Sequence, residues 1–321
     1  MKKMLMPLAA VLVAGCVCDD SWRNGDPRDP VLGNWGLRLG YGEMNAGHMI
    51  MSRDPDGRPQ ALVLWRWGSP MQMKDTRVDG DRFSFVHPWG DKKVEGSVRG
   101  GVLTAEMRDR DGTVETRVEG WRNPPVEPAD TADAEFGDPV DLLADGLDGW
   151  EPMEKNGKFG WRFADGVLSN RLGLDQNGEW VRGGANLRTR RDDFYDFNLT
   201  YDVRFPKGSN SGVYLRGRYE CQVVDSYGKP LDSHNLGAYY GRVTPSAAAE
   251  KPAGEWQHVD VTLYRRHLTV VLNGVRIIDN APVVGITGGA VDADEFVPGF
   301  IYLQGDHSDA DYRNMILRPC L

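Results

Sequence analysis

Short runs of alternating apolar and polar residues, each closed by a turn rich in Gly, Asp or Asn, recur along nearly the whole chain. Runs such as "RFSFV" (82–86) and "TVETRVEGW" (113–121) have the two-residue period of strands, and "DPDG", "DRDG" and "LNGV" have the composition of tight turns. Long stretches with a helical period are scarce. With 39 glycines and 10 tryptophans among 321 residues, the sequence predicts an all-β protein.

A segment rich in proline and acidic residues divides these strands into two groups. "NPPVEPADTADAEFGDP" (123–139) has no periodicity and predicts a solvated, semi-extended linker. The strands of 31–122 form a meander, which closes as a small β barrel or sandwich domain. We expect a structural or accessory role for this domain, because no cluster of His, Asp and Glu in it indicates chemistry. Residues 140–321 are predicted to form a second β domain with longer loops.

The first residues are typical of a bacterial lipoprotein signal. Two lysines precede an apolar run from Leu8 to Val13 that is too short to span a bilayer, and "LVAGC" resembles the lipobox in which Cys16 is lipidated. We therefore predict a signal peptide over 1–15, a tether over 16–30, and a lipid-anchored protein in the cell envelope, in the periplasm or at the outer membrane. An ordinary signal peptide with an incidental cysteine is the alternative.

Charge and cysteine content argue against several classes of protein. The net charge is −9 and no basic run is present, which argues against nucleic acid as a partner. Besides Cys16, the chain has Cys18, Cys221 and Cys320. Their odd number and wide spacing indicate no disulfide framework, and no CxxC or Cys/His cluster indicates zinc. We expect these cysteines to be small buried side chains.

The stretch "NSGVYLRGRYECQVVD" (210–225) predicts a hairpin of unusually polar composition. A two-residue turn at Gly217 and Arg218 would mix apolar and polar residues on both faces. A three-residue turn over 217–219 gives one face that is entirely apolar, so the buried face favours this register. The residues of that apolar face are Val213, Leu215, Cys221 and Val223.

The opposite face of the predicted hairpin is polar. With the three-residue turn, Arg216 lies opposite Glu220 and Tyr214 lies opposite Gln222. In "FNLTYDVRF", Asp202 likewise points away from the apolar residues. Such a face is either a solvated outer surface with weak ion pairs or a concave sheet that lines a sugar cleft. The pattern alone leaves both interpretations open.

Five stretches of the C-terminal half resemble the 3-keto-disaccharide hydrolase domain family. In family order they are "YDFNLTYDVRF", "NSGVYLRGRYECQVVDSYG", "GAYYGRVTPSAAAEKPAGEWQHVDVTL", "LNGVRIIDN" and "GFIYLQGDHSDADYRNMIL". They cover most of residues 138–321. The segment from "GNWGLRL" to "EGWR" also resembles the small β domain that precedes some members. The resemblance implies a concanavalin A-like jelly-roll sandwich with a ligand groove on its concave sheet.

The resemblance also implies an enzyme that cleaves 3-keto-glycosides. A ketone at C3 acidifies the C2–H bond, so a base can remove that proton and the enolate can expel the C1 aglycone, with or without later addition of water. The reaction needs a base, an acid for the leaving oxygen, and a positive or hydrogen-bonding group at the enolate oxygen. The candidate catalytic residues are Glu220, His307 (the base), Asp225 and Arg216 (at the enolate).

Further residues are candidates for binding the sugar. They are Tyr214, Gln222, Asp202, Arg218 and Gln304. Trp161 and Trp180 are either stacking platforms or core residues. For Glu220 and Asp225 the alternative role is ion pairing with the neighbouring arginines, and for His307 it is a hydrogen bond to the backbone of its loop.

This pattern makes no cofactor certain, and a divalent metal at Glu220, Asp225 and His307 would also activate an enolate. The expected partners are a glycoside or oligosaccharide, the membrane surface, and an oxidoreductase that makes the 3-keto sugar. Two other functions remain open. A conventional glycoside hydrolase needs two carboxylates, but Gln222 stands two residues after Glu220 on the strand. A non-catalytic carbohydrate-binding lipoprotein would use the same groove without turnover.

Overall fold

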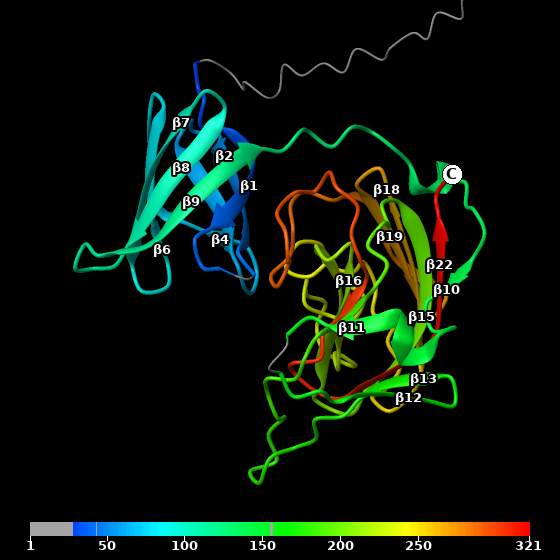
Figure 1. The fold of residues 1–321 in the computed structure, drawn as a ribbon. Coiled ribbons are helices and arrows are strands. Elements are labelled where there is room, and N and C mark those ends of the chain that lie inside the picture. Colours follow the sequence, from blue (N-terminus) through cyan, green and yellow to red (C-terminus); the bar gives the residue numbers. More distant parts are fainter. Residues whose placement is uncertain (1–27, 43, 155–156) are drawn as a thin grey trace, which may run out of the picture.

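The computed structural model describes residues 28–321 except 43, 155 and 156, and forms two β domains (Figure 1). The predicted fold class is confirmed: a small barrel-like β domain precedes a jelly-roll β-sandwich. The predicted signal peptide, the lipidation site Cys16, Cys18 and most of the tether lie outside the described residues. No helix in the described ranges is long and apolar enough to cross a bilayer.

The N-terminal domain is a single antiparallel sheet of nine strands that curls into a nearly closed barrel. Its two edge strands, β4 and β5, are separated along the chain only by the buried Met73. Alternate side chains fill the interior, as in β6, where Phe83 and Phe85 are buried and stack on each other. In sheet order the strands are β4 (Met71–Gln72), β3 (Pro59–Trp65), β2 (Ala46–Arg53), β1 (Gly33–Leu39), β9 (Val114–Arg122), β8 (Val102–Arg108), β7 (Lys92–Arg99), β6 (Arg82–His87) and β5 (Lys74–Asp79).

The C-terminal domain packs two antiparallel sheets face to face. The larger sheet contains, in order, β12 (Trp161–Ala164), β13 (Val167–Asn170), β22 (Ala310–Pro319), β15 (Phe197–Arg204), β18 (Gln257–Tyr264), β19 (His267–Leu272) and β20 (Val275–Pro282), with β10 (Val140–Asp141) paired to β22. The smaller sheet contains β11 (Trp150–Pro152), β14 (Leu187–Thr189), β21 (Tyr302–Leu303), β16 (Asn210–Leu215) and β17 (Tyr219–Val224), and a short 3-10 helix (Gly146–Gly149) precedes it. The core lies between the sheets, where the Tyr201 hydroxyl lies 3.4 Å from Sγ of Cys221.

The hairpin of β16 and β17 has the predicted apolar face but not the predicted turn. Leu215 pairs with Tyr219 and Tyr214 pairs with Glu220, so the loop is 216–218 rather than 217–219. Arg216 and Gly217 both have left-handed backbone angles, with φ of 55° and 67°, and close the chain one residue earlier. The pairing therefore differs by two positions from the expected one. Because side chains alternate with a period of two, the faces are unchanged.

The segment 123–139 is extended and partly exposed, and hydrogen bonds attach it to the C-terminal domain. Arg266 donates to the carbonyl of Pro124 (2.9 Å), and Asn280 donates to the carbonyl of Ala129 (2.8 Å). A short 3-10 helix (Thr131–Asp133) adds a hydrogen bond between the hydroxyls of Thr131 and Thr269 (2.6 Å). These contacts fix the path between the domains.

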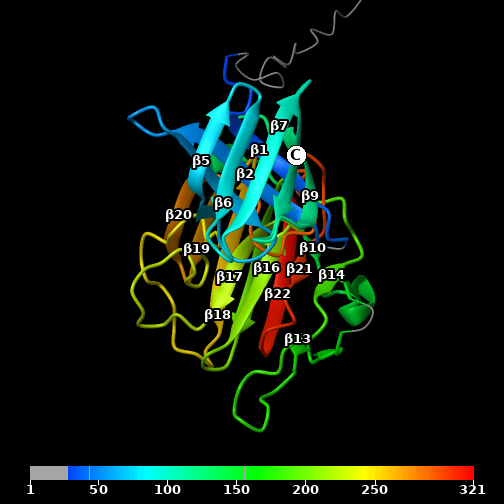
Figure 2. The same cartoon turned by 90° about the vertical axis from the view of Figure 1, so that its left-hand side faces the viewer.

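The two domains are in direct contact, and Figure 2 shows the N-terminal sheet in front of the upper part of the sandwich. Asn123 donates to Glu295 across 2.7 Å, and Oγ of Ser69 lies 2.6 Å from Nε2 of His234. The amide of Gly289 donates to the carbonyl of Arg66 (2.8 Å). The segment after β3 is therefore held against a loop of the sandwich.

Candidate active site

A cleft of about 450 Å³ lies on the polar face of the five-stranded sheet. Its floor comes from β16, β17 and β21, whose opposite face packs into the core. The sandwich contributes Glu154, Asn186, Asn210, Tyr214, Glu220, Gln222, Tyr240, Gly288, Gly289, Tyr302, Gln304, Asp306 and His307. The N-terminal domain contributes Met44, Trp67 and Gly68. The polar face of the hairpin thus lines a cleft and is not an open solvated surface.

Glu220 lies on the floor of this cleft with its carboxyl group buried. Oε2 lies 2.8 Å from the hydroxyl of Tyr214, its cross-strand partner. Burial raises the pKa of Glu220 to about 8; the hydrogen bond with Tyr214 lowers this pKa and the nearby Asp306 carboxylate raises it. The side chain fits because residue 212 is glycine, since a Cβ at that position would overlap the Glu220 carboxyl group. Glu220 is therefore a carboxyl group that holds its proton at neutral pH.

Two stacked tyrosines form the rest of the floor. The rings of Tyr214 and Tyr302 lie 3.9 Å apart and nearly parallel. Their hydroxyls lie 2.7 Å from the carbonyl oxygen of Gly288 and 3.0 Å from that of Gly289. Burial raises the pKa of both hydroxyls far above the ordinary value, so both remain protonated. The loop at 288–289 is thus fixed above the sheet.

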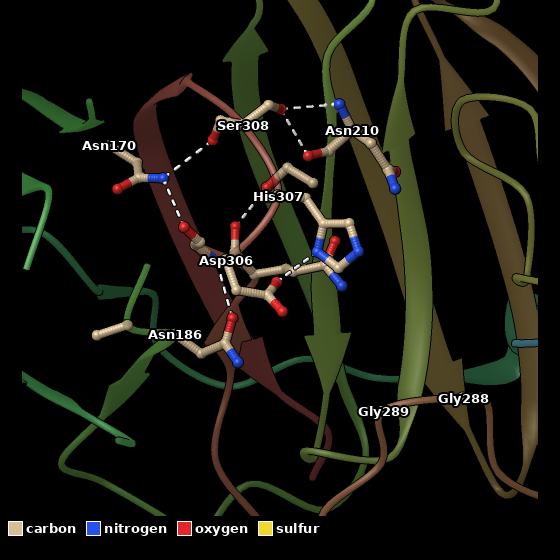
Figure 3. Close-up of polar contacts among 12 residues, drawn as sticks. Asn170, Asn186, Asn210, Gly288, Gly289, Asp306, His307 and Ser308 are labelled. Atoms are coloured by element: carbon tan, nitrogen blue, oxygen red, sulfur yellow. Dashed lines mark hydrogen bonds and ion pairs between the residues drawn. The ribbon is translucent and has the colours of Figure 1, made fainter. Parts of the chain in front are cut away.

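The loop after β21 carries Asp306 and His307 and is held in place by asparagine side chains (Figure 3). Asn170, which is fully buried, donates to the carbonyls of Gly305 (3.0 Å) and Ser308 (2.9 Å). Oδ1 of Asn186 accepts from the amide of Gly305 (2.8 Å). The Ser308 hydroxyl in turn donates to the carbonyl of Asn210 and accepts from its amide. These bonds fix both ends of the short loop.

Within this loop, Nδ1 of His307 lies 2.5 Å from Oδ1 of Asp306 (Figure 3). A proton on Nδ1 satisfies this contact, so Nε2 carries the free lone pair. Both side chains are partly exposed in the cleft wall. The pair has the form of a histidine base whose tautomer is set by a carboxylate.

Glu154 is a second carboxyl group in the cleft wall, partly buried, and no motif in the sequence pointed to it. Its oxygens accept from the backbone amide (2.7 Å) and the side-chain amide (2.8 Å) of Asn186. Burial raises the pKa of Glu154. Glu154 and Asn186 come from opposite ends of an excursion of more than thirty residues, which local pattern analysis does not connect.

Two acceptors in the cleft are buried and have no donor among the described residues: Oδ1 of Asn210 and Oε1 of Gln304. A buried polar atom without a partner costs free energy, which a bound hydroxyl group would recover. Gln222 is better satisfied, because its Oε1 accepts from the amide of Val223 (2.8 Å). Its amide nitrogen remains as a donor. The cleft therefore offers amide groups to a polyhydroxylated ligand.

The model of the 3-keto-alpha-glucoside-1,2-lyase-like domain matches residues 139–318. The chain belongs to this family. The family predicted from the sequence is thereby confirmed, and with it a carbohydrate-active function. A search of curated proteins gave no match.

Several solved structures are similar to the chain. Two proteins named provisionally as glycosyl hydrolases come from Parabacteroides distasonis. One is 25% identical, with 61% of this chain and 93% of that chain covered and a TM-score of 0.45. The other is 22% identical, with 57% and 100% covered and a TM-score of 0.44. A carbohydrate-binding module from Bacillus subtilis is 16% identical, with 52% and 93% covered and a TM-score of 0.32.

The family domain brings together five of the nine predicted catalytic and binding residues. Those that line the cleft are Glu220, His307, Tyr214, Gln222 and Gln304. Arg216, Arg218, Asp202 and Asp225 are absent from the lining. The predicted common groove for all nine residues is therefore wrong for four of them.

Arg216 and Arg218 lie in the turn of the hairpin and form hydrogen bonds there. Arg216 is fully buried, donates to the carbonyls of Glu295 (2.5 Å) and Val297 (3.0 Å), and lies over the ring of Tyr195. Arg218 donates to the carbonyl of Arg216 (2.6 Å) and pairs weakly with Asp292. Because the loop begins at residue 216, both side chains leave the polar face of the sheet. Neither the expected enolate contact of Arg216 nor its pairing with Glu220 is present.

The two aspartates lie elsewhere for different reasons. Asp202 is on β15, in the eight-stranded sheet, where it accepts from Arg313 (3.1 Å) and Asn314 (2.8 Å) and meets His258. Its outward face belongs to the other side of the sandwich. Asp225 follows the end of β17 and accepts from the amide of Gly208 (2.9 Å).

The structure also places the two tryptophans and the three residues of the metal hypothesis. Trp161 is buried and donates to the carbonyl of Ala185 (2.7 Å), so it is a core residue. Trp180 donates to Gly208 and is not in the cleft lining. The predicted metal trio is not assembled, because Asp225 lies outside the cleft. Among the residues that the structure describes, no group of three or more His, Cys, Asp and Glu side chains is arranged to hold a metal ion.

The contribution of the N-terminal domain to the cleft was not foreseen. Gly68 lies so close to Gly288 that a Cβ at position 288 would overlap the Gly68 backbone. Trp67, which is about half exposed, lines the cleft beside it. The only signal in the sequence was an uncommonly tryptophan-rich stretch, "LWRWGSP", at the end of a strand.

Proposed function

We propose that this protein cleaves 3-keto-glycosides by removing the C2 proton and eliminating the aglycone, with or without later addition of water. Glu220 acts as the acid that protonates the glycosidic oxygen. The His307–Asp306 pair acts as the base. The family supports a carbohydrate as the substrate, and the paired acid and base in one cleft support the reaction type.

The observation that carries the proposal is the position of the Tyr214 hydroxyl. It lies 2.8 Å from Oε2 of Glu220 and 2.7 Å from the carbonyl oxygen of Gly288. A tyrosine hydroxyl has one proton, and a carbonyl can only accept. The Tyr214 hydroxyl therefore faces two acceptors with a single proton. When that proton goes to Gly288, a protonated Glu220 completes the second contact by donating to the Tyr214 oxygen. This arrangement supports Glu220 as a proton donor.

The proposed steps balance without a further reagent. Nε2 of His307 takes the proton from C2, and the C2–H electron pair forms the C2–C3 double bond of an enolate. When the C3 carbonyl re-forms, a C1–C2 double bond is made and the bond from C1 to the aglycone oxygen breaks. Glu220 delivers its proton to that oxygen. The products are an unsaturated 3-keto sugar and the free aglycone, and water adds to the sugar when hydrolysis is the net result.

The amide groups of the cleft hold the sugar in this proposal. Asn210 and Gln304 present unpartnered oxygens to its hydroxyl groups. With Arg216 buried elsewhere, the amide nitrogen of Gln222 is the donor we place at the enolate oxygen. A hydrogen bond there stabilises the charge that develops during proton removal.

A conventional glycoside hydrolase is the second candidate, and Glu154 is the observation that favours it. A second carboxyl group in the same cleft as Glu220 provides the pair that such enzymes need. The two functions differ in substrate. Proton removal from C2 requires the C3 ketone, whereas direct hydrolysis does not.

The test is to compare turnover of a 3-keto-glucoside with that of the same glucoside carrying a C3 hydroxyl. We expect cleavage of the keto substrate only, with transient absorbance from an unsaturated ketone. Equal cleavage of both substrates would establish the conventional hydrolase. Binding without cleavage of either would show a carbohydrate-binding protein.

Location and supply of substrate are part of the proposal. The "LVAGC" sequence supports a lipid anchor at Cys16 in the cell envelope. A ketone at C3 arises by oxidation of a secondary alcohol, so an oxidoreductase must provide the substrate.

A further inference from the structure

A second pocket, of about 430 Å³, opens beside the cleft in the N-terminal domain. It lies at one end of the barrel, where β1, β3, β6 and β8 end and β7 and β9 begin. Trp67 lines both this pocket and the cleft. The two spaces are therefore neighbours that share one wall.

The new pocket is lined by aromatic rings that are unusually open. Trp89 is 64% exposed and Trp67 is 49% exposed. Both rings are nevertheless supported, since Trp89 lies edge-on to His87 (6.1 Å) and the Arg66 guanidinium lies over Trp67 (5.2 Å). Large exposed apolar surfaces that are held in place mark binding sites more often than chance. We call Tyr41, Trp65, Trp67, His87 and Trp89 the aromatic pocket.

Most polar groups of the aromatic pocket are already engaged with one another, whereas Nε2 of His87 is buried without a partner among the described residues. Glu115 accepts from the Tyr41 hydroxyl (3.0 Å) and from Lys92. The Tyr41 hydroxyl also accepts from Nε1 of Trp65 (3.2 Å), and Nε of Arg66 donates to the carbonyl of Met44 (2.9 Å). A sugar ring would have to compete for these donors and acceptors. A flat apolar ring needs only the exposed faces of the tryptophans.

Two methionines complete the lining and agree with this chemistry. Met71 and Met107 contribute thioether side chains, which adapt their shape to an apolar guest and make favourable contacts with aromatic rings. The pocket therefore combines stacking surfaces with adaptable apolar walls.

The position of the pocket relative to the cleft is fixed by the backbone. Gly289 donates to the carbonyl of Arg66 (2.8 Å), and Gly288 packs directly on Gly68. Trp67 lies in the wall that the two spaces share, so a leaving group that extends past Trp67 from a sugar over Glu220 enters the aromatic pocket. We propose that the aromatic pocket binds the aglycone, and that this aglycone is a planar aromatic group. The inference rests on the proposed function.

The experiment compares wild type with Trp89→Ala on two 3-keto substrates, a 4-nitrophenyl glucoside and a methyl glucoside. Trp89 lines the aromatic pocket but not the cleft. We expect KM for the nitrophenyl substrate to rise about three- to tenfold and KM for the methyl substrate to stay unchanged. Tyr227→Ala, which removes a similarly exposed aromatic ring outside both pockets, is the matched control.

A binding measurement separates failure of this inference from failure of the proposed function. Calorimetric titration with 2-naphthol alone should show binding to wild type that weakens in Trp89→Ala but not in Tyr227→Ala. If no 3-keto-glucoside is cleaved, this result still supports an aromatic-binding pocket. The inference would be overturned if Trp89→Ala changed KM equally for both glucosides, or changed KM more for a 3-keto-disaccharide. It would also be overturned if 2-naphthol bound wild type and Trp89→Ala with the same affinity.

Discussion

Tyr214 and Glu220 face each other across β16 and β17, and the hydroxyl of one lies 2.8 Å from the carboxyl group of the other. A neutral carboxyl group satisfies this contact as a donor. An amide can do the same through its N–H. The pair therefore allows the acid to be removed without disturbing the hydrogen bonds around it.

The first prediction uses this property. In Glu220→Gln the hydrogen bond to Tyr214 is kept and the transferable proton is lost. We expect turnover of a 3-keto-glucoside to fall on the order of 10²–10⁴-fold, and the free energy of unfolding near pH 4, where Glu220 is protonated in both the folded and the unfolded chain, to change by less than about 1 kcal/mol. Asp225→Asn, on the same hairpin but outside the cleft, should keep wild-type turnover. Wild-type turnover in Glu220→Gln would remove Glu220 from the mechanism.

The second prediction concerns pH. Burial raises the pKa of Glu220 from an ordinary value near 4.5 to about 8. Between these values the unfolded chain has lost this proton while the folded chain keeps it, so this group makes folding less favourable as pH rises. Urea unfolding should show Glu220→Gln gaining stability relative to wild type from about pH 5 to about pH 8.

The pH dependence of turnover should reflect the protonation of Glu220. Wild-type turnover is expected to fall above about pH 8 as Glu220 loses its proton and can no longer protonate the leaving oxygen. A stability difference that does not depend on pH, together with a flat rate profile, would show that Glu220 does not titrate in this range.

The third prediction tests the space that glycine leaves for the acid. In Gly212→Ala the new methyl group overlaps the Glu220 carboxyl group. Because β16 is paired on both sides, with β17 and β21, the side chain of Glu220 must move. We expect turnover to fall at least about tenfold and the protein to lose about 1–3 kcal/mol of stability.

The matched control is Gly149→Ala, where the nearest atom to a new Cβ is the carbonyl oxygen of Leu142, at an ordinary 3.8 Å. It should leave turnover unchanged. If Gly212→Ala behaves like this control, the close approach of Glu220 to β16 is not needed for activity.

The fourth prediction concerns the membrane anchor. Cys16→Ser removes the lipid acceptor from the "LVAGC" sequence. We expect wild type in the membrane fraction and the variant in the soluble or unprocessed fraction, as judged by cell fractionation and intact mass. Retention of a fully processed Cys16→Ser variant at the membrane would contradict lipidation at this residue.

The faces of the hairpin could be predicted, whereas its turn could not. Val213 and Cys221 are core residues in either register, because alternation depends only on parity. The turn instead depends on Arg216 adopting a left-handed backbone, a conformation that arginine seldom takes. Its buried guanidinium donates to the carbonyl of Glu295, 79 residues away in the sequence, and this contact stabilises the left-handed conformation. The sequence around Arg216 does not indicate a contact with so distant a residue.

The positions of Asp202 and Trp67 also depend on contacts between distant segments, which local sequence patterns do not predict. The alternation of β15 correctly indicated that Asp202 faces outward, but nothing local states which of the two sheets a strand joins. Trp67 reaches the cleft because Gly68 packs on Gly288, more than two hundred positions later in the chain. Residues that act through such distant contacts are found only once the fold is known.

The segment after β3 has a consequence for how this protein can change over time. It forms one wall of the cleft, yet it belongs to a domain with a hydrophobic core of its own, and two residues of that domain, Ala46 and Leu64, pack into the core of the sandwich. Substitutions around Trp67 can change which leaving groups fit the cleft. They leave unchanged the residues that we expect to transfer protons, because those residues belong to the other domain. Preference for a leaving group can therefore evolve separately from the ability to expel it, and a domain exchange that keeps the contacts of Ala46 and Leu64 would transfer the first without the second.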